Sequence, residues 1–365
     1  MMGATNANNT SFYFAEGDTR QAGSMTYSTF VSILNPSATN TAHVQTTYYS
    51  HGSAVETDTV VVGPLKRGTG ISKLHQQFAI KVTSDIGVVV ERPMYFNDNI
   101  ATAGGWTSGA ASAVGATSLG PNSGSDWLFA EGFTGNGHSF QEYLVLANFT
   151  TTNATVNVKL EYTNGTVQTV PVTVPQQSQY YFDVNNAYNH PISGCGCTPT
   201  SSVSAEVYSS APSIVAERLM YFHYGSAHIS GGTDVVGEAG PSSHAVYTFA
   251  EGYTFGSFSE FLTLQNPSNA VESVAITLFA DNTILQEMLQ LQPHSRSTVS
   301  INSMIVPLAL AYPTSPIYQA YEVSMDIQAF STSGGAPATV VAERPLYFNF
   351  EGDPGGTDVL GYTGG

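Results

Sequence analysis

The sequence contains the same motifs three times. The block Phe-Ala-Glu-Gly begins at residues 14, 129 and 249, at spacings of 115 and 120 residues. A second block, Glu-Arg-x-x-Tyr-Phe, begins at residues 91, 217 and 343. Solenoid and propeller repeats are roughly 20 to 50 residues long, whereas this spacing is the size of an independent domain. We therefore predict a polar arm at residues 1–10 and three tandem modules: module 1 (11–120), module 2 (121–240) and module 3 (241–365).

Two further recurring motifs support this division. The first is an Asn that ends an apolar segment in each module: Asn35, Asn148 and Asn266. The second is Gly-Gly-Thr-Asp-Val-x-Gly, which closes module 2 at residues 231–237 and module 3 at 355–361. In module 1 the glycine-rich segment 104–109 lacks the Asp. The Gly-Pro linkers at 120–121 and 240–241 are short, so we expect neighbouring modules to touch.

Within a module the hydrophobic period is two. In module 2, Val156, Val158 and Leu160 alternate with polar residues, and Asn164-Gly165 is a favoured hairpin turn. Helical periodicity is weak, and prolines interrupt the one apolar stretch at 305–312 that could form a helical turn. The pattern predicts an all-β protein of three antiparallel, immunoglobulin-like β-sandwiches with roughly seven strands each.

The combined motifs resemble a known family. The string of Phe-Ala-Glu-Gly, Leu-x-Asn-Pro, Val-Ala-Glu-Arg-Pro-x-Tyr-Phe and Gly-Gly-Thr-Asp-Val-x-Gly is similar to an uncharacterised repeat domain found in tandem in exported, cell-surface proteins of bacteria. The resemblance covers essentially the whole chain. It implies an extracellular or cell-surface location, and it brings no catalytic residues with it. Module 1 departs from the pattern by its missing Asp, and module 2 by Phe149 in place of Pro.

Charge is scarce and mostly negative. Only 10% of the 365 residues are charged, and 27 acidic residues against 10 basic ones give a net charge of −17. A chain with so few basic residues has no patch to grip phosphates, so we predict no nucleic-acid binding. The longest apolar run is far shorter than the roughly 20 residues that cross a bilayer, so we predict no membrane span. The polar start of the chain lacks a secretory signal, and we expect either a recombinant piece or a processed form.

The acidic and basic residues of the two main motifs lie on strands whose apolar neighbours indicate burial. Buried charges are tolerated when they are paired, and the planar Arg fork suits a carboxylate. We predict one structural ion pair inside each module: Glu16 with Arg92, Glu131 with Arg218, and Glu251 with Arg344. The alternative, in which Glu16 and Glu91 are the acid and base of a glycosidase, is disfavoured because the arrangement recurs in every module and a nearby Arg keeps carboxyl pKa values low. We predict no enzymatic activity.

Other candidate sites are weaker. Cys195 and Cys197 predict a disulfide outside the cell, either between the two or to another chain. Zinc binding by these thiolates with His190 lacks a fourth ligand. Asp residues in glycine turns could bind calcium, although turn stabilisation is the commoner role; these are Asp234, Asp353 and Asp358. We therefore expect no metal and no cofactor, with calcium the one exception considered.

Sugars could be attached or bound. Glycosylation sequons occur at Asn8, Asn9, Asn148, Asn153 and Asn164. Trp106 lies in the glycine-rich loop of module 1 and is the candidate for an exposed residue that stacks on a glycan, although core or interface packing is the commoner role of a Trp. Trp127 begins a predicted core strand and should be buried.

These features favour a structural or adhesive surface protein: a rod of three sandwiches that self-associates. One form of this expectation is the subunit of a surface filament or sheath that assembles head to tail. The polar arm would add to a neighbour's sheet edge through Asn6, Asn8, Asn9 and Thr10. The alternative is a carbohydrate-binding module array of an exported protein, with surface glycans as partners.

Overall fold

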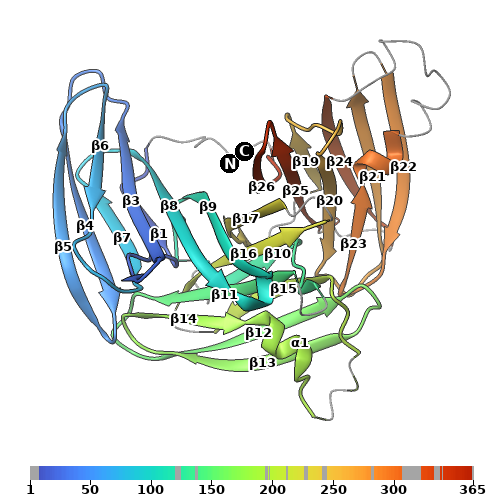
Figure 1. Cartoon of the computed structure of the whole chain (residues 1–365), viewed down its shortest axis with the longest axis horizontal. Coiled ribbons are helices and arrows are strands. Elements are labelled where there is room, and N and C mark those ends of the chain that lie inside the picture. Colours follow the sequence, from blue (N-terminus) through green and yellow to red (C-terminus); the bar gives the residue numbers. More distant parts are fainter. Residues whose placement is uncertain are drawn as a thin grey trace.

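The computed structural model is built almost entirely of antiparallel β-sheets, as the period-two pattern predicts (Figure 1). It describes residues 8–119, 125–135, 139–193, 196, 198–210, 213–225, 229–240, 245–280, 283–305, 322–332, 338 and 340–363. Each of its six sheets takes its strands from one of the three predicted modules, two sheets to a module.

Module 1 has one sheet of order β1-β7-β4-β5 and a second of order β2-β3-β8-β9, in which β6 also pairs with β3. The bounds are β1 (Ser11–Phe14), β2 (Gln21–Ala22), β3 (Met25–Asn35), β4 (Ala42–Ser50), β5 (Ser53–Val62), β6 (Lys66–Ile71), β7 (Ala79–Ser84), β8 (Val89–Ile100), the 3-10 turn η1 (Ala101–Ala103) and β9 (Gly105–Val114).

Module 2 has sheets of order β13-β12-β15-β10-β18 and β14-β11-β16-β17. The bounds are β10 (Ser125–Phe129), β11 (Phe140–Asn148), β12 (Ala154–Tyr162), β13 (Val167–Val174), β14 (Ser178–Asp183), α1 (Val184–Asn189), β15 (Val203–Ser209), β16 (Val215–Tyr224), β17 (Ile229–Val236) and β18 (Glu238–Ala239).

Module 3 has sheets of order β19-β24-β21-β22 and β23-β20-β25-β26. The bounds are β19 (Val246–Phe249), β20 (Ser259–Asn266), β21 (Glu272–Ala280), β22 (Thr283–Leu291), β23 (Ser295–Ser300), β24 (Val323–Ser331), β25 (Val341–Phe350) and β26 (Asp353–Leu360).

The hairpin of β12 and β13 shows how local sequence sets these strands. Apolar residues at every second position of β12 are buried. Gly165 adopts φ +77°, a left-handed conformation that glycine accepts without strain, and its N–H donates to the Tyr162 carbonyl over 2.9 Å. The predicted turn at Asn164-Gly165 is therefore confirmed. Helix α1 was not predicted; the Asp183 side chain caps it by accepting from the Asn186 N–H.

The modules follow an arc, and their apolar cores run into one another. Module 1 lies at the left of Figure 1, module 2 at the bottom and module 3 at the right, and β9, β17 and β26 contact each other in turn along the inside of the arc. Phe96 of module 1 lies in the same apolar cluster as the core of module 2. Phe140 and Phe222 of module 2 likewise cluster with Tyr347 of module 3. Neighbouring modules therefore touch, as the short linkers predict.

Among the described residues, no helix is long and apolar enough to cross a membrane.

Candidate functional site

The repeated Arg of the Glu-Arg block binds two carboxylates of the following module. Arg92 of β8 donates from Nη2 to Glu217 Oε2 on β16 over 2.9 Å and to Asp234 Oδ2 on β17 over 2.5 Å. All three side chains are completely buried. We call this cluster of one guanidinium and two carboxylates joint 1–2, because it fastens module 1 to module 2.

The same cluster recurs one repeat later as joint 2–3. Arg218 Nη1 donates to Glu343 Oε2 over 2.7 Å, and Nη2 bonds to the Asp358 carboxylate. Nη1 also donates to the Glu131 carbonyl oxygen over 2.7 Å. Glu343 and Asp358 stand at the repeat positions of Glu217 and Asp234. The recurrence of the same arrangement at two module boundaries indicates a specific contact between modules.

The Glu of each joint also binds the backbone of the preceding module. Glu217 Oε1 accepts the Ala15 N–H over 2.9 Å, and Glu343 Oε1 accepts the Ala130 N–H over 2.9 Å. Both donors belong to the Phe-Ala-Glu-Gly block. The blocks that recur in the sequence therefore meet each other across the joints.

The Glu of the Phe-Ala-Glu-Gly block is a further link between modules. The Glu16 carboxylate accepts a hydrogen bond from the Tyr181 hydroxyl on β14. Glu131 Oε2 accepts one from Arg296 Nη2 on β23 over 3.0 Å. Strands β14 and β23 are equivalent in their modules, since each pairs with the strand that ends at the recurring Asn.

Two of the three predicted ion pairs are therefore wrong as drawn. Glu16 does not pair with Arg92, and the Glu131 carboxylate does not pair with Arg218, because the partners of all four side chains just described lie in the next module or in the backbone. Alternation along a strand shows which face a side chain occupies, but it does not show which module covers that face.

The third predicted pair is present. Arg344 Nη1 lies 2.7 Å from Glu251 Oε2. Among the described residues, no following module covers the Arg344 side of module 3. The pair inside a module thus forms where the described structure has no following module to supply a Glu and an Asp.

Glycine makes the close approach of the modules possible. A Cβ on Gly232 would lie 2.7 Å from the Cζ atom of Phe96, and one on Gly356 would lie 2.5 Å from that of Phe222. The ring of each Phe thus presses on the glycine strand of the following module. The neighbouring Tyr completes the contact, with ring centroids 5.0 Å apart for Phe96 and Tyr221 and 4.9 Å for Phe222 and Tyr347.

Module 1 lacks two of these joint residues. Strand register places Ala110 opposite Tyr95, where modules 2 and 3 have Gly232 and Gly356 opposite their tyrosines. Register also places Ser112 where the other modules have their Asp. The departure of module 1 from the sequence motif therefore falls on the residues that would receive a preceding module.

Burial raises the pKa of carboxyl groups at the joints, and the excess of carboxylates over guanidinium groups adds to this effect. Burial raises the pKa of Glu217, and the Asp234 charge raises it further against the opposing effect of Arg92. Burial likewise raises the pKa of Glu343. Glu142, buried close to Arg218, has its pKa raised by burial to about 8. Each joint is therefore a low-dielectric site where carboxyl groups retain protons more readily than in water.

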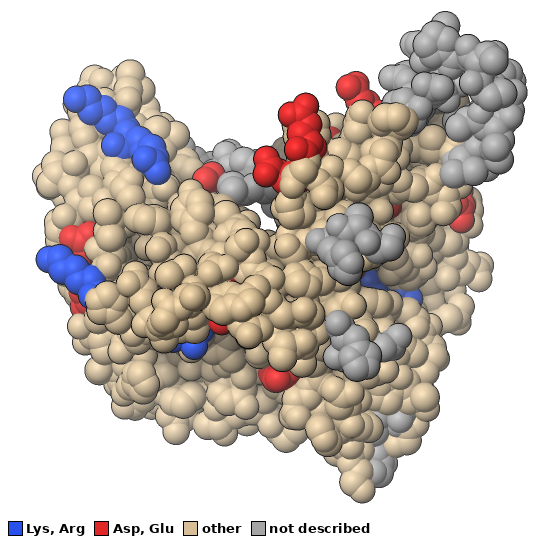
Figure 2. Space-filling view, in the orientation of Figure 1, with Lys and Arg blue, Asp and Glu red and all other residues tan. Residues whose placement is uncertain are grey.

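The basic residues of modules 2 and 3 are all engaged. These modules contain two each, Lys159, Arg218, Arg296 and Arg344. The three arginines are buried, and Lys159 lies 2.8 Å from Glu161 and 2.9 Å from Glu206. The face in Figure 2 accordingly shows few basic side chains, most of them at the left, over module 1, together with scattered acidic ones. Such a surface offers few salt bridges to any partner.

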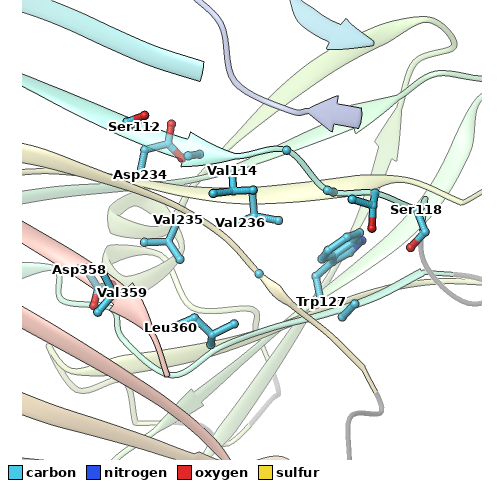
Figure 3. A pocket seen from close by; sticks show the side chains of 16 residues that line it. Ser112, Val114, Ser118, Trp127, Asp234, Val235, Val236, Asp358, Val359 and Leu360 are labelled. Atoms are coloured by element: carbon cyan, nitrogen blue, oxygen red, sulfur yellow. The ribbon is translucent and has the colours of Figure 1, made fainter. Parts of the chain in front are cut away.

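A cavity of 280 Å³ lies where the three glycine strands meet (Figure 3). Its walls are mainly apolar and come from β9, β17 and β26, with Trp127 at one end. Trp127 is buried as predicted, and its indole N–H donates to the Ile214 carbonyl over 2.9 Å. The cavity lies at the lower end of the roughly 300 to 1,000 Å³ of small-molecule sites. We interpret it as the seam between three packed strands.

Asn148 is not available for glycosylation. Its side chain is fully buried and donates to the Thr152 and Val174 carbonyls while accepting the Thr150 N–H. The equivalent residues Asn35 and Asn266 make the same kind of contacts. The recurring Asn thus closes a turn in each module. A sequon gives no information on burial, which is why this prediction was wrong.

The remaining sequons are accessible to different degrees. Asn8, Asn153 and Asn164 are exposed and Asn9 is half-buried. The Asn9 and Thr10 carbonyls accept the Val88 and Ser84 N–H groups of module 1, so this end of the predicted arm belongs to its own module.

Trp106 is about half exposed, and it lies on strand β9. Its carbonyl accepts a hydrogen bond from His223 of module 2 over 3.2 Å. Asn6, Cys195 and Cys197 lie outside the described residues.

The Asp residues considered for calcium have other partners or an open setting. Asp234 and Asp358 bind the joint arginines, and Asp353 is exposed at the start of β26. In the part of the chain that the structure describes, no group of three or more His, Cys, Asp or Glu side chains is placed to hold a metal ion. The role of Asp234 and Asp358 in joining modules was not predicted from the sequence. The available signal was that module 1 has Ser112 in place of this Asp.

Comparison with known proteins gives little guidance. No protein-family model and no curated protein matches the chain. Among solved structures, Thermotoga maritima 1070 has a TM-score of 0.25 at 12% identity, covering 32% of this chain and 92% of its own. The Anabaena sensory rhodopsin transducer has a TM-score of 0.20 at 21% identity, covering 24% and 91%. Latent PorU from Porphyromonas gingivalis has a TM-score of 0.15 at 8% identity, covering 93% and 29%. These scores are too low to carry an argument.

Proposed function

We propose that this chain is a structural protein of the bacterial cell surface or extracellular space, in which tandem β-sandwich modules form a stiff arc. The observation that carries the proposal is the pair of buried joints: Arg92 and Arg218 each bind a Glu and an Asp of the next module. Modules joined by buried ion pairs and shared apolar cores hold a fixed geometry, whereas flexibly linked binding modules need no such contact.

The scarcity of free basic side chains supports the same role. With the basic side chains of modules 2 and 3 engaged, side-by-side contacts of these modules with neighbours would depend mainly on backbone pairing, aromatic rings and hydroxyl groups.

Localisation tests this proposal. Antibodies raised against the chain should label the outer surface of the producing cells, or material shed from it, in immunogold electron microscopy. Labelling confined to the cell interior would contradict the proposal.

A second candidate function rests on Trp106, whose side chain is half exposed beside the boundary of modules 1 and 2. An exposed indole can stack on a sugar ring, so the chain could bind polysaccharide. Binding in a glycan array that Trp106→Ala abolishes would favour this function, and an absence of binding to every polysaccharide would exclude it.

A further inference from the structure

We propose that a second copy of this chain docks its module 1 on the open face of module 3, forming an intermolecular joint that is a weaker version of joints 1–2 and 2–3. The proposal rests on the structural role proposed above and names the partner and the residues. The acceptor face consists of Glu251, Arg344 and Phe348 of module 3. The donor face consists of Arg67, Glu91 and Tyr95 of module 1.

The acceptor face keeps the residues that modules 1 and 2 present to their following modules. Arg344 stands where Arg92 and Arg218 stand, and like them it is buried. It pairs with Glu251, which stands where Glu131 stands. The Glu131 side chain is 7% exposed inside joint 2–3, whereas that of Glu251 is 66% exposed. Phe348 is half-buried, while its equivalents Phe96 and Phe222 are buried.

A groove lies beside this acceptor face. It is lined by Glu251, Tyr253, Phe258, Phe279 and Phe350, and the last two rings are 42% and 57% exposed. The equivalent surface of module 2, around Glu131 and Phe140, is covered by Arg296 and Tyr347 of module 3. Continuity with an existing interface therefore indicates that the groove receives another module.

The donor face keeps the residues that modules 2 and 3 present to their preceding modules. Tyr95 is 53% exposed, whereas the equivalent Tyr221 and Tyr347 are 3% and 4% exposed in the two internal joints. Glu91 stands where Glu217 and Glu343 stand.

Arg67 completes the donor face. It pairs in register with Leu34, as Arg296 pairs with Gln265 at the same place in module 3. Its side chain is exposed, with Nη2 donating to the Ser32 hydroxyl over 2.9 Å. It is therefore placed to act on Glu251 as Arg296 acts on Glu131.

The charges of the two faces are complementary in the order that joint 2–3 uses. In that joint Arg218 meets Glu343 while Glu131 meets Arg296. In the proposed joint Arg344 would meet Glu91 while Glu251 would meet Arg67, and Tyr95 would pack on Phe348. A like-charge approach would repel, so this pattern selects one orientation.

Two donor residues make the intermolecular joint weaker than the internal ones. In module 1, Ala110 has a methyl group at the position where Gly232 and Gly356 leave room for a Phe ring. Ser112 has a hydroxyl group at the position where modules 2 and 3 have an Asp carboxylate. Because donor and acceptor faces differ, the contact is heterologous and leads to filaments or rings. A weak joint of this kind would assemble reversibly.

Sedimentation velocity of the full chain over about 1 to 100 µM, where weak interfaces dissociate, tests the proposal. We expect the native chain to associate with rising concentration, and Arg344→Met or Glu91→Gln each to remain monomeric. A mixture of these two variants should form a one-to-one dimer, because one retains the donor face and the other the acceptor face. That dimer also shows that both variants are folded.

The variant Ala110→Gly/Ser112→Asp provides the opposite test. Restoring the glycine and the carboxylate should strengthen association at least tenfold over the native chain, and Arg344→Met in that background should abolish it. Native association that survives both Arg344→Met and Glu91→Gln would overturn the proposal, as would monomeric behaviour of the native and the restored chains. Association of the restored chain alone would also overturn it, because the partner would then be a different module that carries the Gly and the Asp. None of these results bears on surface localisation, which tests the proposed function separately.

Discussion

Arg218 of module 2 binds Glu343, a residue one full repeat away, although Glu217 is its neighbour in sequence. Glu217 in turn binds Arg92 of module 1. Adjacent residues of a strand point to opposite faces, so the Glu and the Arg of one motif serve two different joints. The Glu217-Arg218 block thereby contacts the module before it through Glu217 and the module after it through Arg218.

Removing the guanidinium of joint 2–3 should destabilise the protein strongly. Arg218→Met leaves Glu343 and Asp358 buried without their cation, a change that costs about 3 to 5 kcal/mol in comparable buried ion pairs. Urea unfolding followed by circular dichroism measures the loss. Lys73→Met, at an exposed side chain, is the control and should stay within about 0.5 kcal/mol of the native chain.

Replacing the whole cluster should restore much of that stability. In Arg218→Met/Glu343→Met/Asp358→Leu no buried charge of the cluster is left unpaired, and apolar replacements of buried ion-pair clusters are often neutral or stabilising. The triple variant should therefore unfold at a higher urea concentration than Arg218→Met alone. Equal or lower stability would show that the joint depends on packing that the charged groups alone provide.

A methyl group on the glycine strand should disturb joint 1–2. Gly232→Ala brings a Cβ to 2.7 Å from the Phe96 ring, and overpacking of this kind costs about 1 to 3 kcal/mol. Gly63→Ala is the matched control, because its nearest contact would be 3.5 Å from a flexible Lys66 carbon. Thermal unfolding of the two variants should show a clear loss for the first and almost none for the second.

The stability gained from Glu142→Gln should depend on pH. Burial raises the pKa of Glu142 from 4.5 to about 8, so the folded state keeps a proton that the unfolded state releases. Stability therefore falls as pH rises from about 4.5 to about 8, since the unfolded state binds fewer protons there. Glu142→Gln removes this dependence. Its midpoint temperature relative to the native chain should be more favourable at pH 9 than at pH 5, and an unchanged difference would contradict the raised pKa.

Asn148 should carry no glycan even in a host that glycosylates exported proteins. Its buried amide group makes hydrogen bonds to two carbonyls and one N–H, so Asn148→Ala should cost about 1 to 3 kcal/mol for each buried partner left unsatisfied. Peptide mass mapping checks the first expectation and urea unfolding the second. Asn153→Ala, at an exposed sequon, is the comparison for both.

The recurring Glu and Arg residues of the candidate site were predictable, but their pairing was not. The recurrence of Glu16, Arg92 and their equivalents identified the charged residues, and their apolar neighbours in sequence identified their burial. The pairing failed for modules 1 and 2 because period-two alternation assigns a side chain to a face and gives no information on what lies over it. No repeat in the sequence pointed to Tyr181 and Arg296. They lie at different register positions of the equivalent strands β14 and β23, and one side chain is a phenol whereas the other is a guanidinium.

The sequence by itself determined the all-β class, the recurrence of the motifs, the hairpin at Asn164-Gly165 and the scarcity of basic side chains. These follow from local patterns, because turn chemistry and alternation act over a few residues. Tertiary structure decided that the buried charges join neighbouring modules and that Asp234 and Asp358 complete those joints. It also decided that the recurring Asn is buried, so that the Asn148 side chain is inaccessible to glycosylation. A guanidinium will bind whichever buried carboxylate is nearest, and across a spacing of 125 residues only the folded packing of two modules sets that distance.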